Sequence, residues 1–258
     1  MNPGTWRDWL PFPPDLSEHG AQIDHLITVV HYLMFALFIG WGIYFVYVLV
    51  HFRKREGHKA SYNPAKGKIA KYTEIGVIVA EAVLLVAMSM PAWAAWKKAF
   101  PPASNALHVR MVAEQFAWNF HYPGPDGIFG RTDHKLMNNT GNSLGLDLSD
   151  PHAKDDIVTL GEFHIPLNKP VIVDISSKDV IHSFTINVLR VKQDAIPGEV
   201  IPIHFTATKQ GTGTYEINCS QLCGLGHYRM QGFVYIDTPE QYAQWFAQKE
   251  KELQGATQ

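Results

Sequence analysis

Two cysteines, a histidine and a methionine lie close together near the end of the chain. In the stretch 218–230, which reads N-C-S-Q-L-C-G-L-G-H-Y-R-M, Cys219, Cys223, His227 and Met230 follow one another at intervals of four, four and three residues. One tight loop can therefore bring two thiolates, an imidazole and a thioether together. Thiolates and thioethers select copper, zinc or iron–sulfur clusters, and a thiolate with imidazole and a weak axial Met is a copper electron-transfer ligand set. The stretch predicts a soft-metal site.

The number of cysteines bears on the number of metal ions. A single blue copper needs one Cys, so two cysteines four residues apart suggest that both sulfurs bridge a pair of copper ions, each with one His and one weak axial donor. The second His is expected to be His182, in D-V-I-H-S-F, on a strand or strand end after the β-branched run 171–175. Asp179 and Ser183 flank it and are candidates to orient its ring, as outer-shell groups commonly do. Asp179 fits an exposed turn equally well.

Two other uses of these residues have to be weighed against copper. Cys219 and Cys223 would form a disulfide if the turn brought their Cα atoms to roughly 5.5 Å in an oxidising compartment. Two Cys and two His also suit a structural zinc site. Zinc has no use for Met230 at its offset, and any one of the 13 His alone is more often a surface or core residue. The whole set of residues favours copper.

Three segments together carry a family resemblance. D-V-I-H-S-F at 179–184, D-A-I-P-G at 194–198 and C-S-Q-L-C-G-L-G-H-Y-R-M at 219–230 resemble the binuclear copper (Cu-A) domain of cytochrome c oxidase subunit II. The resemblance covers most of the chain. It implies two copper ions and a cupredoxin-like β-sandwich. The ligands that it implies are His182, Cys219, Cys223, His227, Met230 and the backbone carbonyl of Gln221.

The resemblance also implies a function and partners. Cytochrome c would reduce the copper pair, which would pass the electron to haem in the catalytic subunit I, where oxygen is reduced to water; other oxidase subunits would complete the complex. A relay suits a site without an open coordination position, which a catalytic metal site normally keeps. Two alternatives stay open, the copper subunit of a nitric-oxide reductase and a membrane-tethered copper carrier. Against a carrier, the ligands come from two distant segments.

The first hundred residues are expected to form a membrane anchor. Residues 26–50 contain no Asp, Glu, Lys or Arg and are long enough to cross a hydrocarbon core of about 30 Å. The two helices are predicted at about 26–51 and 75–96, the second interrupted by Glu81 and Pro91. The short loop between them is rich in Lys and Arg, and such loops stay on the cytoplasmic side. This predicts a multi-pass protein of a bacterial or mitochondrial inner membrane, with the copper domain on the periplasmic or outer side.

Composition excludes several other classes. The 258-residue chain has a formal net charge of −2, so no nucleic-acid partner is expected. It has only two Cys, so neither a disulfide framework nor a C-x-x-C-H haem attachment motif is expected. Residues 1–25, rich in Pro and aromatic residues, predict an interfacial lead-in without an evident cleavable signal.

The remainder predicts a membrane-anchored all-β protein with a short C-terminal helix. We place the boundary between the membrane domain, 1–102, and the copper domain, 103–258, at the Pro101-Pro102 break. Strands are expected at 107–112, 116–122, 157–160, 171–175, 184–188, 200–205, 213–218 and 232–236, a sandwich pattern. Residues 239–253 predict a helix with Thr238 as its N-cap. The Asp-rich stretch 123–156 predicts a long surface loop that a partner orders.

Three further roles come from the resemblance. Electron entry is implied at Phe116 and Trp118, where relatives have two Trp, with Asp126 and Asp133 steering a dedicated or tethered cytochrome c. Glu74 matches an acid at the mouth of a proton pathway, although a plain interfacial acid is the alternative. Gln221 stands where many relatives have a Glu that binds magnesium. An amide is a weaker ligand for this hard cation, so we expect magnesium to be absent or weakly held.

Overall fold

The structure is a computed structural model that describes residues 12–57, 59, 62, 67–138, 141–211 and 213–256. The chain forms two compact units, one of residues Gln22–Ala99 and the other of Phe100–Gln258 together with the residues up to Ala21. The described residues of the expected lead-in, 12–21, therefore group with the C-terminal part of the chain. Its residues before Phe12 lie outside the described residues.

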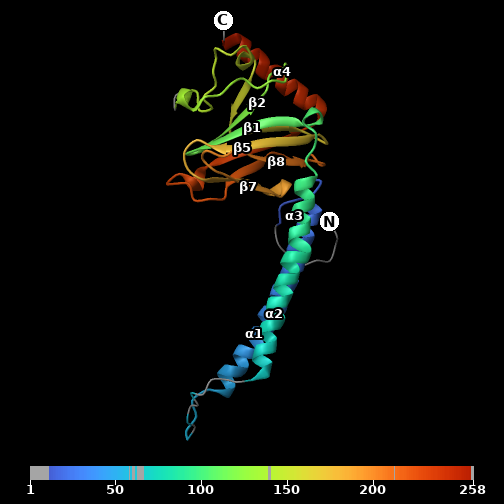
Figure 1. Cartoon of the computed structure of the whole chain (residues 1–258), viewed down its shortest axis with the longest axis vertical. Helices are drawn as coiled ribbons and strands as arrows, with labels where there is room; N and C mark the ends of the chain where they lie inside the picture. Colours follow the sequence, from blue (N-terminus) through green and yellow to red (C-terminus); the bar gives the residue numbers. More distant parts are fainter. Residues whose placement is uncertain are drawn as a thin grey trace. The chain divides into compact units, whose positions relative to one another are not determined.

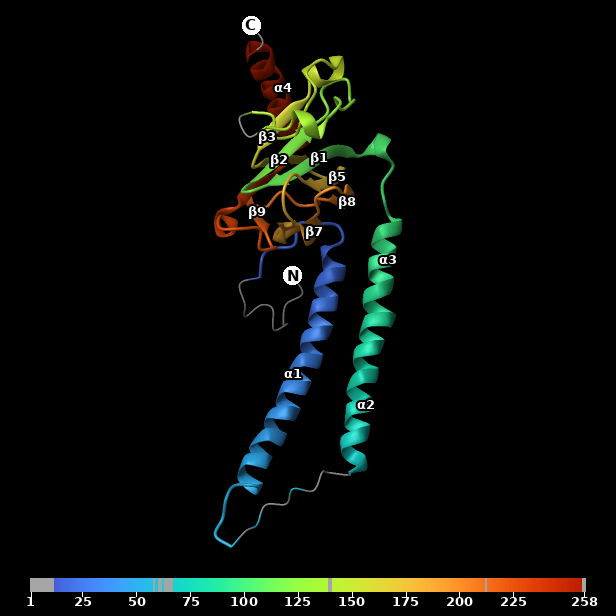
Figure 2. The same cartoon turned by 60° about the vertical axis from the view of Figure 1, so that its left-hand side comes forward.

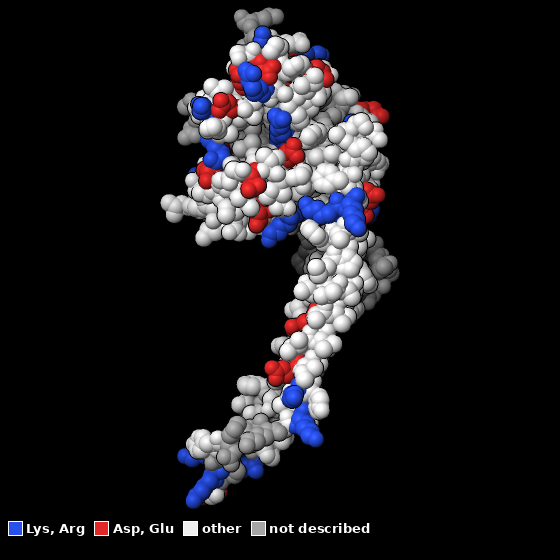
Figure 3. Space-filling view, in the orientation of Figure 1, with Lys and Arg blue, Asp and Glu red and all other residues white. Residues whose placement is uncertain are grey.

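The helical unit contains two helices of membrane-spanning length. Helix α1 spans Gly20–His51, and the second span, Lys68–Lys98, consists of α2 (Lys68–Val83), a π-helical turn η2 (Leu84–Ser89) and α3 (Met90–Lys98). The spans contain 32 and 31 residues, with mean hydropathies of 2.3 and 2.1, and their apolar side chains point outward, as lipid or partner helices require. Figure 2 shows both helices, and in Figure 3 Lys and Arg gather at the tip where the connecting segment lies.

Pro91 lies within the second span without ending it. It occupies the first turn of α3, directly after the π-helical turn. A Pro in a helix interior removes one hydrogen bond and crowds the preceding carbonyl, and a π-bulge is one of the local adjustments by which a helix accommodates such a break. The two predicted membrane helices are thus present, each beginning several residues earlier than predicted.

The C-terminal unit is a sandwich of two five-stranded sheets (Figure 1). The first sheet has the order β3-β2-β1-β5-β8 and the second has the order β4-β10-β9-β6-β7. Pairs β1–β5 and β4–β10 are parallel and the other pairs are antiparallel. The strands are β1 Leu107–Glu114, β2 Ala117–Tyr122, β3 Ile157–Leu160, β4 Glu162–Pro166, β5 Pro170–Ser177, β6 His182–Ile186, β7 Val191–Ala195, β8 Ile201–Thr206, β9 Tyr215–Cys219 and β10 Gln231–Asp237.

Aromatic rings from both sheets fill the space between them. Phe120 of β2 stacks on Phe163 of β4 at 4.6 Å, and Phe184 of β6 meets both Phe120 and Trp118 edge-on. All four side chains are fully buried.

The alternation of more and less buried residues along β1 and β10 follows from the period of two in a strand. The predicted cupredoxin-like β-sandwich with a membrane anchor and a C-terminal helix is confirmed.

Two strands were not predicted from the sequence, namely β4 and β7. Each lies at an edge of the second sheet, and β7, with the sequence V-K-Q-D-A, turns its charged residues to solvent. An edge strand leaves one row of backbone groups unpaired, and such strands are often short and carry charged residues, as β7 does.

The C-terminal helix α4, Pro239–Ala256, closes one end of the sandwich. Thr238 and Gln241 form a reciprocal capping box, with Thr238 Oγ1 accepting from Gln241 N and Gln241 Oε1 accepting from Thr238 N, so the predicted N-cap is confirmed. Trp245 stacks on His164 of β4 at 4.3 Å and contacts Tyr122 edge-on. The helix is therefore held by aromatic contacts with both sheets.

The long loop after β2 is tied down by its own polar contacts. Asp156, fully buried, contacts His121 Nε2 at 2.5 Å and accepts hydrogen bonds from the backbone of Gly124 and Gly130. Further along the loop, Arg131 pairs with Asp147. The expectation that this loop needs a partner to become ordered was therefore wrong for its described part, because a buried carboxylate gathers its ends.

Candidate metal centre

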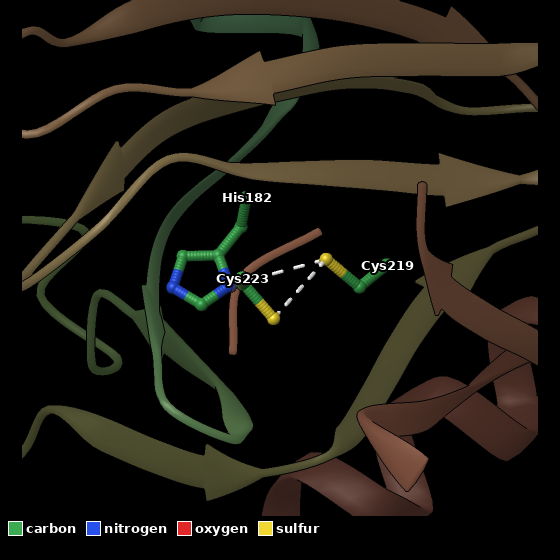
Figure 4. A group of neighbouring side chains, drawn as sticks. All are labelled: His182, Cys219 and Cys223. Carbon is green, nitrogen blue, oxygen red and sulfur yellow. Dashed lines mark hydrogen bonds between the residues drawn. The ribbon is translucent and has the colours of Figure 1, made fainter. Parts of the chain in front are cut away.

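The soft ligands come from two neighbouring strands and the loop between β9 and β10. His182 begins β6, Cys219 ends β9, and the pairing of these strands places Phe184 opposite Cys219. His182 is two residues before Phe184 on the same face, so it is a diagonal neighbour of Cys219. Figure 4 shows His182, Cys219 and Cys223 pointing toward one another.

The loop between β9 and β10 brings two more predicted ligands, His227 and Met230, to the same cluster. His227 lies in a short 3₁₀ turn, His227–Arg229, and Met230 directly precedes β10. Cys223 Sγ lies 3.6 Å from His227 Nδ1 and 3.7 Å from Met230 Sδ. All side chains predicted as ligands are therefore brought together, although they come from segments almost fifty residues apart in sequence.

The distances place both sulfur atoms among the other donors. Cys219 Sγ and Cys223 Sγ are 3.8 Å apart. His182 Nδ1 lies 3.9 Å from Cys219 Sγ and 3.2 Å from Met230 Sδ. The carbonyl oxygen of Gln221 lies 3.1 Å from Cys219 Sγ, and His227 lies beside Cys223. The sulfur pair is thus surrounded by two imidazoles, one thioether and one carbonyl oxygen.

These separations fit donors that share metal ions. Tetrahedral bonds of about 2.3 Å to sulfur and 2.0 Å to nitrogen place neighbouring donors roughly 3.5 Å apart. A disulfide requires about 2.05 Å between sulfurs, so Cys219 and Cys223, both free, are not bonded to each other here. Met230 is buried with its sulfur in the cluster, which favours copper over zinc because thioether is a soft ligand. The donor set fits a copper site.

The two thiols differ in their tendency to ionise. Burial opposes ionisation of Cys219, but hydrogen bonds from His182 and from backbone groups overcome it and lower the pKa of this thiol to about 6. Burial together with the neighbouring charge of Cys219 raises the pKa of Cys223 to about 11. Without metal, Cys219 is therefore the more readily ionised of the two thiols, and a bound cation would favour ionisation of both.

Asp179 orients the imidazole of His182. Its Oδ1 lies 2.8 Å from His182 Nε2, and its Oδ2 accepts a hydrogen bond from the backbone of Gln115. This contact leaves His182 Nδ1 facing the sulfur atoms, the arrangement in which an outer-shell carboxylate fixes a ligand ring. Asp179 is also exposed in the bend before β6, so the exposed-turn expectation holds together with the orienting contact. Ser183 does not share this role, because its buried hydroxyl has no hydrogen-bond partner among the described residues.

Of the two residues predicted for electron entry, only one reaches the surface. Trp118 is 0 % exposed and packs edge-on against His182 at 6.2 Å, so a docking surface centred on it is excluded. It lies on the same face of β2 as Phe120 and packs against Phe184 of the second sheet. Phe116, in the turn between β1 and β2, is half-buried and lies against the ligand loop.

The side chains of the other predicted residues supply no donor to the described cluster. Asp126 and Asp133 belong to the long loop, and Asp126 pairs with His152 at 2.6 Å. Glu74 and Glu81 are exposed on α2 in the helical unit. The side chain of Gln221 is exposed beside the ligand loop. Sequence reasoning missed Gln115, whose side chain contacts this loop. Its position in a turn next to Phe116 was the only available signal.

A membrane-anchored copper protein with a cupredoxin-like domain is the class that this fold and donor set define. The family model for the periplasmic domain of cytochrome c oxidase subunit II matches residues 107–236. The alternative cytochrome c oxidase subunit 2 of Bradyrhizobium diazoefficiens is 31% identical over 242 residues, which are 93% of this chain and 83% of that protein. Subunit 2 of Cereibacter sphaeroides is 27% identical over 252 residues, covering 92% and 79%.

The chain belongs to the cytochrome c oxidase subunit II family. It is therefore a membrane-bound subunit of an oxidoreductase complex, in a family that binds copper. Among solved structures, the periplasmic domain of subunit II of cytochrome oxidase of Bradyrhizobium japonicum is 28% identical, with a TM-score of 0.42, covering 59% of this chain and 98% of that one.

Proposed function

We propose that the cluster holds two copper ions that share both thiolates. The observation that carries this proposal is the number of donors around one sulfur pair. His182 and the carbonyl of Gln221 lie beside Cys219 Sγ, and His227 and Met230 lie beside Cys223 Sγ. The cluster therefore supplies one imidazole and one weak donor for each of two ions. A single blue copper would use both imidazoles, one thiolate and the thioether, and would leave the second thiolate unused.

The site suits electron relay better than catalysis at the metal. A copper pair, when bound, would carry one electron shared by two metals. The residues of this chain fix the donors: the strand pairing β6–β9 places His182, and Asp179 holds its ring. With all ligand positions supplied by protein, no substrate position is left open. Accordingly, the chain accepts an electron from cytochrome c and passes it to haem in catalytic subunit I, for reduction of oxygen to water.

The exposed side of the ligand loop supports contact with partner proteins. Leu222, Leu225 and Tyr228 are 80%, 99% and 85% exposed, although they flank the buried ligands. Apolar side chains exposed together commonly mark an interaction surface, and transfer at the loop requires donor and acceptor proteins to come close.

The Lys and Arg residues in the connection between the two helices favour a cytoplasmic position for that connection. The copper domain then lies on the periplasmic or outer side of an inner membrane.

The test uses the full-length chain in detergent, loaded with copper. We expect two copper ions per chain and an EPR spectrum whose hyperfine structure arises from one unpaired electron shared by two equivalent copper nuclei. One copper per chain with the hyperfine pattern of a single nucleus would contradict the proposal. His227→Ala should convert the first pattern to the second, whereas His164→Ala, which removes a stacked imidazole of the same domain, should leave the pattern unchanged.

The two alternatives give different results. A copper carrier would release its copper to a mild chelator and would support no electron transfer from cytochrome c. A nitric-oxide reductase subunit would show the same copper spectrum, but the purified complex would turn over nitric oxide in place of oxygen.

A further inference from the structure

The turn between β1 and β2 lies against the ligand loop. Gln115 Nε2 donates a hydrogen bond to the carbonyl oxygen of Cys223 at 2.5 Å. The backbone N–H of the same residue donates to Asp179 Oδ2 at 2.7 Å, and Asp179 in turn holds His182. Gln115 therefore connects the two segments of the chain that supply the metal donors, through its side chain on one and its backbone on the other.

Phe116 fills the space next to the same loop. A Cβ atom added to Gly226 would lie 2.4 Å from Cδ2 of the Phe116 ring, well inside van der Waals contact. Gly226 has φ −94° and ψ 8°, a conformation that most residues can adopt at the third position of a type I turn. The ring of Phe116, and not the backbone conformation, therefore requires a residue without a side chain at Gly226. Gly224 differs, because its φ of +139° would strain any other residue.

We propose that Gln115 and Phe116 are positioning residues that clamp the copper-ligand loop against the sandwich. The hydrogen bond fixes the peptide of Cys223, and the ring fixes the backbone at Gly226, one residue before His227. The proposal builds on the proposed copper function and adds residues that touch no donor atom. Its consequence is that the loop keeps the donor spacing whether or not metal is bound, so that copper is lost slowly and its ligands move little during electron transfer.

The experiment measures the rate at which a copper(I) chelator removes copper from the reduced full-length chain. Outer-shell substitutions typically weaken metal binding about 10- to 100-fold, so Gln115→Ala should speed release at least about tenfold. Gln193→Ala is the matched control, because the amide of Gln193 donates to the carbonyl of its neighbour Asp194; it should leave the rate unchanged. Circular dichroism of each variant separates loop effects from loss of fold.

A double-mutant cycle tests the ring contact independently. Gly226→Ala alone should speed release about tenfold, since its methyl group collides with the ring. In a Phe116→Ala background the same substitution should change the rate by less than about twofold, because the collision is gone. Equal effects of Gly226→Ala in both backgrounds, or a Gln115→Ala rate equal to that of Gln193→Ala, would overturn the clamp. The release rates can be measured whether each chain binds one or two copper ions. EPR tests the binuclear proposal separately, so its failure can be distinguished from failure of the clamp.

Discussion

Asp179 and His182 lie three residues apart, and the carboxylate of the first holds the imidazole of the second at 2.8 Å. The same ring presents Nδ1 to Met230 Sδ and Cys219 Sγ. Nε2 of His182 thus contacts the carboxylate, and Nδ1 faces the sulfur atoms. The ring cannot flip without losing the contact with the acid.

Asp179→Asn tests this arrangement. A neutral amide holds the ring less firmly than a carboxylate, so we expect copper affinity to fall by about tenfold or more. Competition with a chelator of known affinity measures it, together with the EPR spectrum of the copper that remains. Asp194→Asn, at an exposed position of β7, is the control. Unchanged affinity in Asp179→Asn would show that the contact does not orient the ligand.

Glu114 predicts a pH dependence of stability. Burial opposes its ionisation, but hydrogen bonds from Lys178, Asn119 and Ser143 outweigh burial and hold the pKa of this carboxyl below its usual value of 4.5. A carboxyl whose pKa is lower in the folded state stabilises the fold above the unfolded pKa. This stability is lost as the pH falls through the folded pKa.

Glu114→Gln should therefore destabilise the domain at pH 7 by about 1–3 kcal/mol, the usual cost of leaving a partner such as Lys178 unsatisfied. The difference from the wild type should shrink as the pH falls below 4.5. Thermal unfolding of the copper-free chain across this range measures both effects. Glu216→Gln, exposed on β9, should show neither, and a constant difference at all pH values would contradict the explanation.

Gln221 predicts weak magnesium binding. Its carbonyl faces Cys219 Sγ, while its exposed side chain ends in a neutral amide, a poorer ligand than carboxylate for a hard cation. Manganese, a magnesium substitute visible by EPR, should bind the wild-type complex substoichiometrically, and Gln221→Glu should raise its affinity. A tightly bound, stoichiometric ion in the wild type would refute this prediction.

Phe116 predicts the point of electron entry from cytochrome c. It is the residue of the expected pair that reaches the surface, since Trp118 is buried behind it. Stopped-flow reduction of copper-loaded protein should slow about tenfold in Phe116→Ala, a typical loss for an aromatic anchor. Charge reversal of Asp126 and Asp133, which are partly exposed, should flatten the dependence on ionic strength. If both variants retain the wild-type rate at every salt concentration, entry occurs elsewhere.

Glu74 predicts a role in proton uptake. It lies on α2 seven residues from Glu81, so both share a helix face about 10 Å apart along the axis, and an acid in a membrane helix usually faces protein or water. In the assembled oxidase, Glu74→Gln should lower turnover and proton uptake, whereas Glu81→Gln serves as the comparison. Equal turnover and proton uptake in Glu74→Gln and the wild type would show that Glu74 is a plain interfacial acid.

Local sequence was sufficient for the ligands of the metal-binding loop and for the anchor. Cys219, Cys223, His227 and Met230 lie in one loop, so their spacing already implied convergence. The two apolar runs could be predicted as helices from their length and low content of charged residues. The strand pattern also follows local alternation, except at the short edge strands β4 and β7, each of five residues.

Tertiary structure decided what depends on which strands pair and which faces turn inward. His182 became a neighbour of Cys219 only because β6 pairs with β9. Trp118 is buried because its side of β2 faces the core, whereas Phe116, in the turn, escapes that alternation. Gln115 reaches Cys223, 108 residues away in the sequence, through the packing of a turn on a loop. No local pattern encodes such a contact, because neither segment carries a periodicity that specifies its partner.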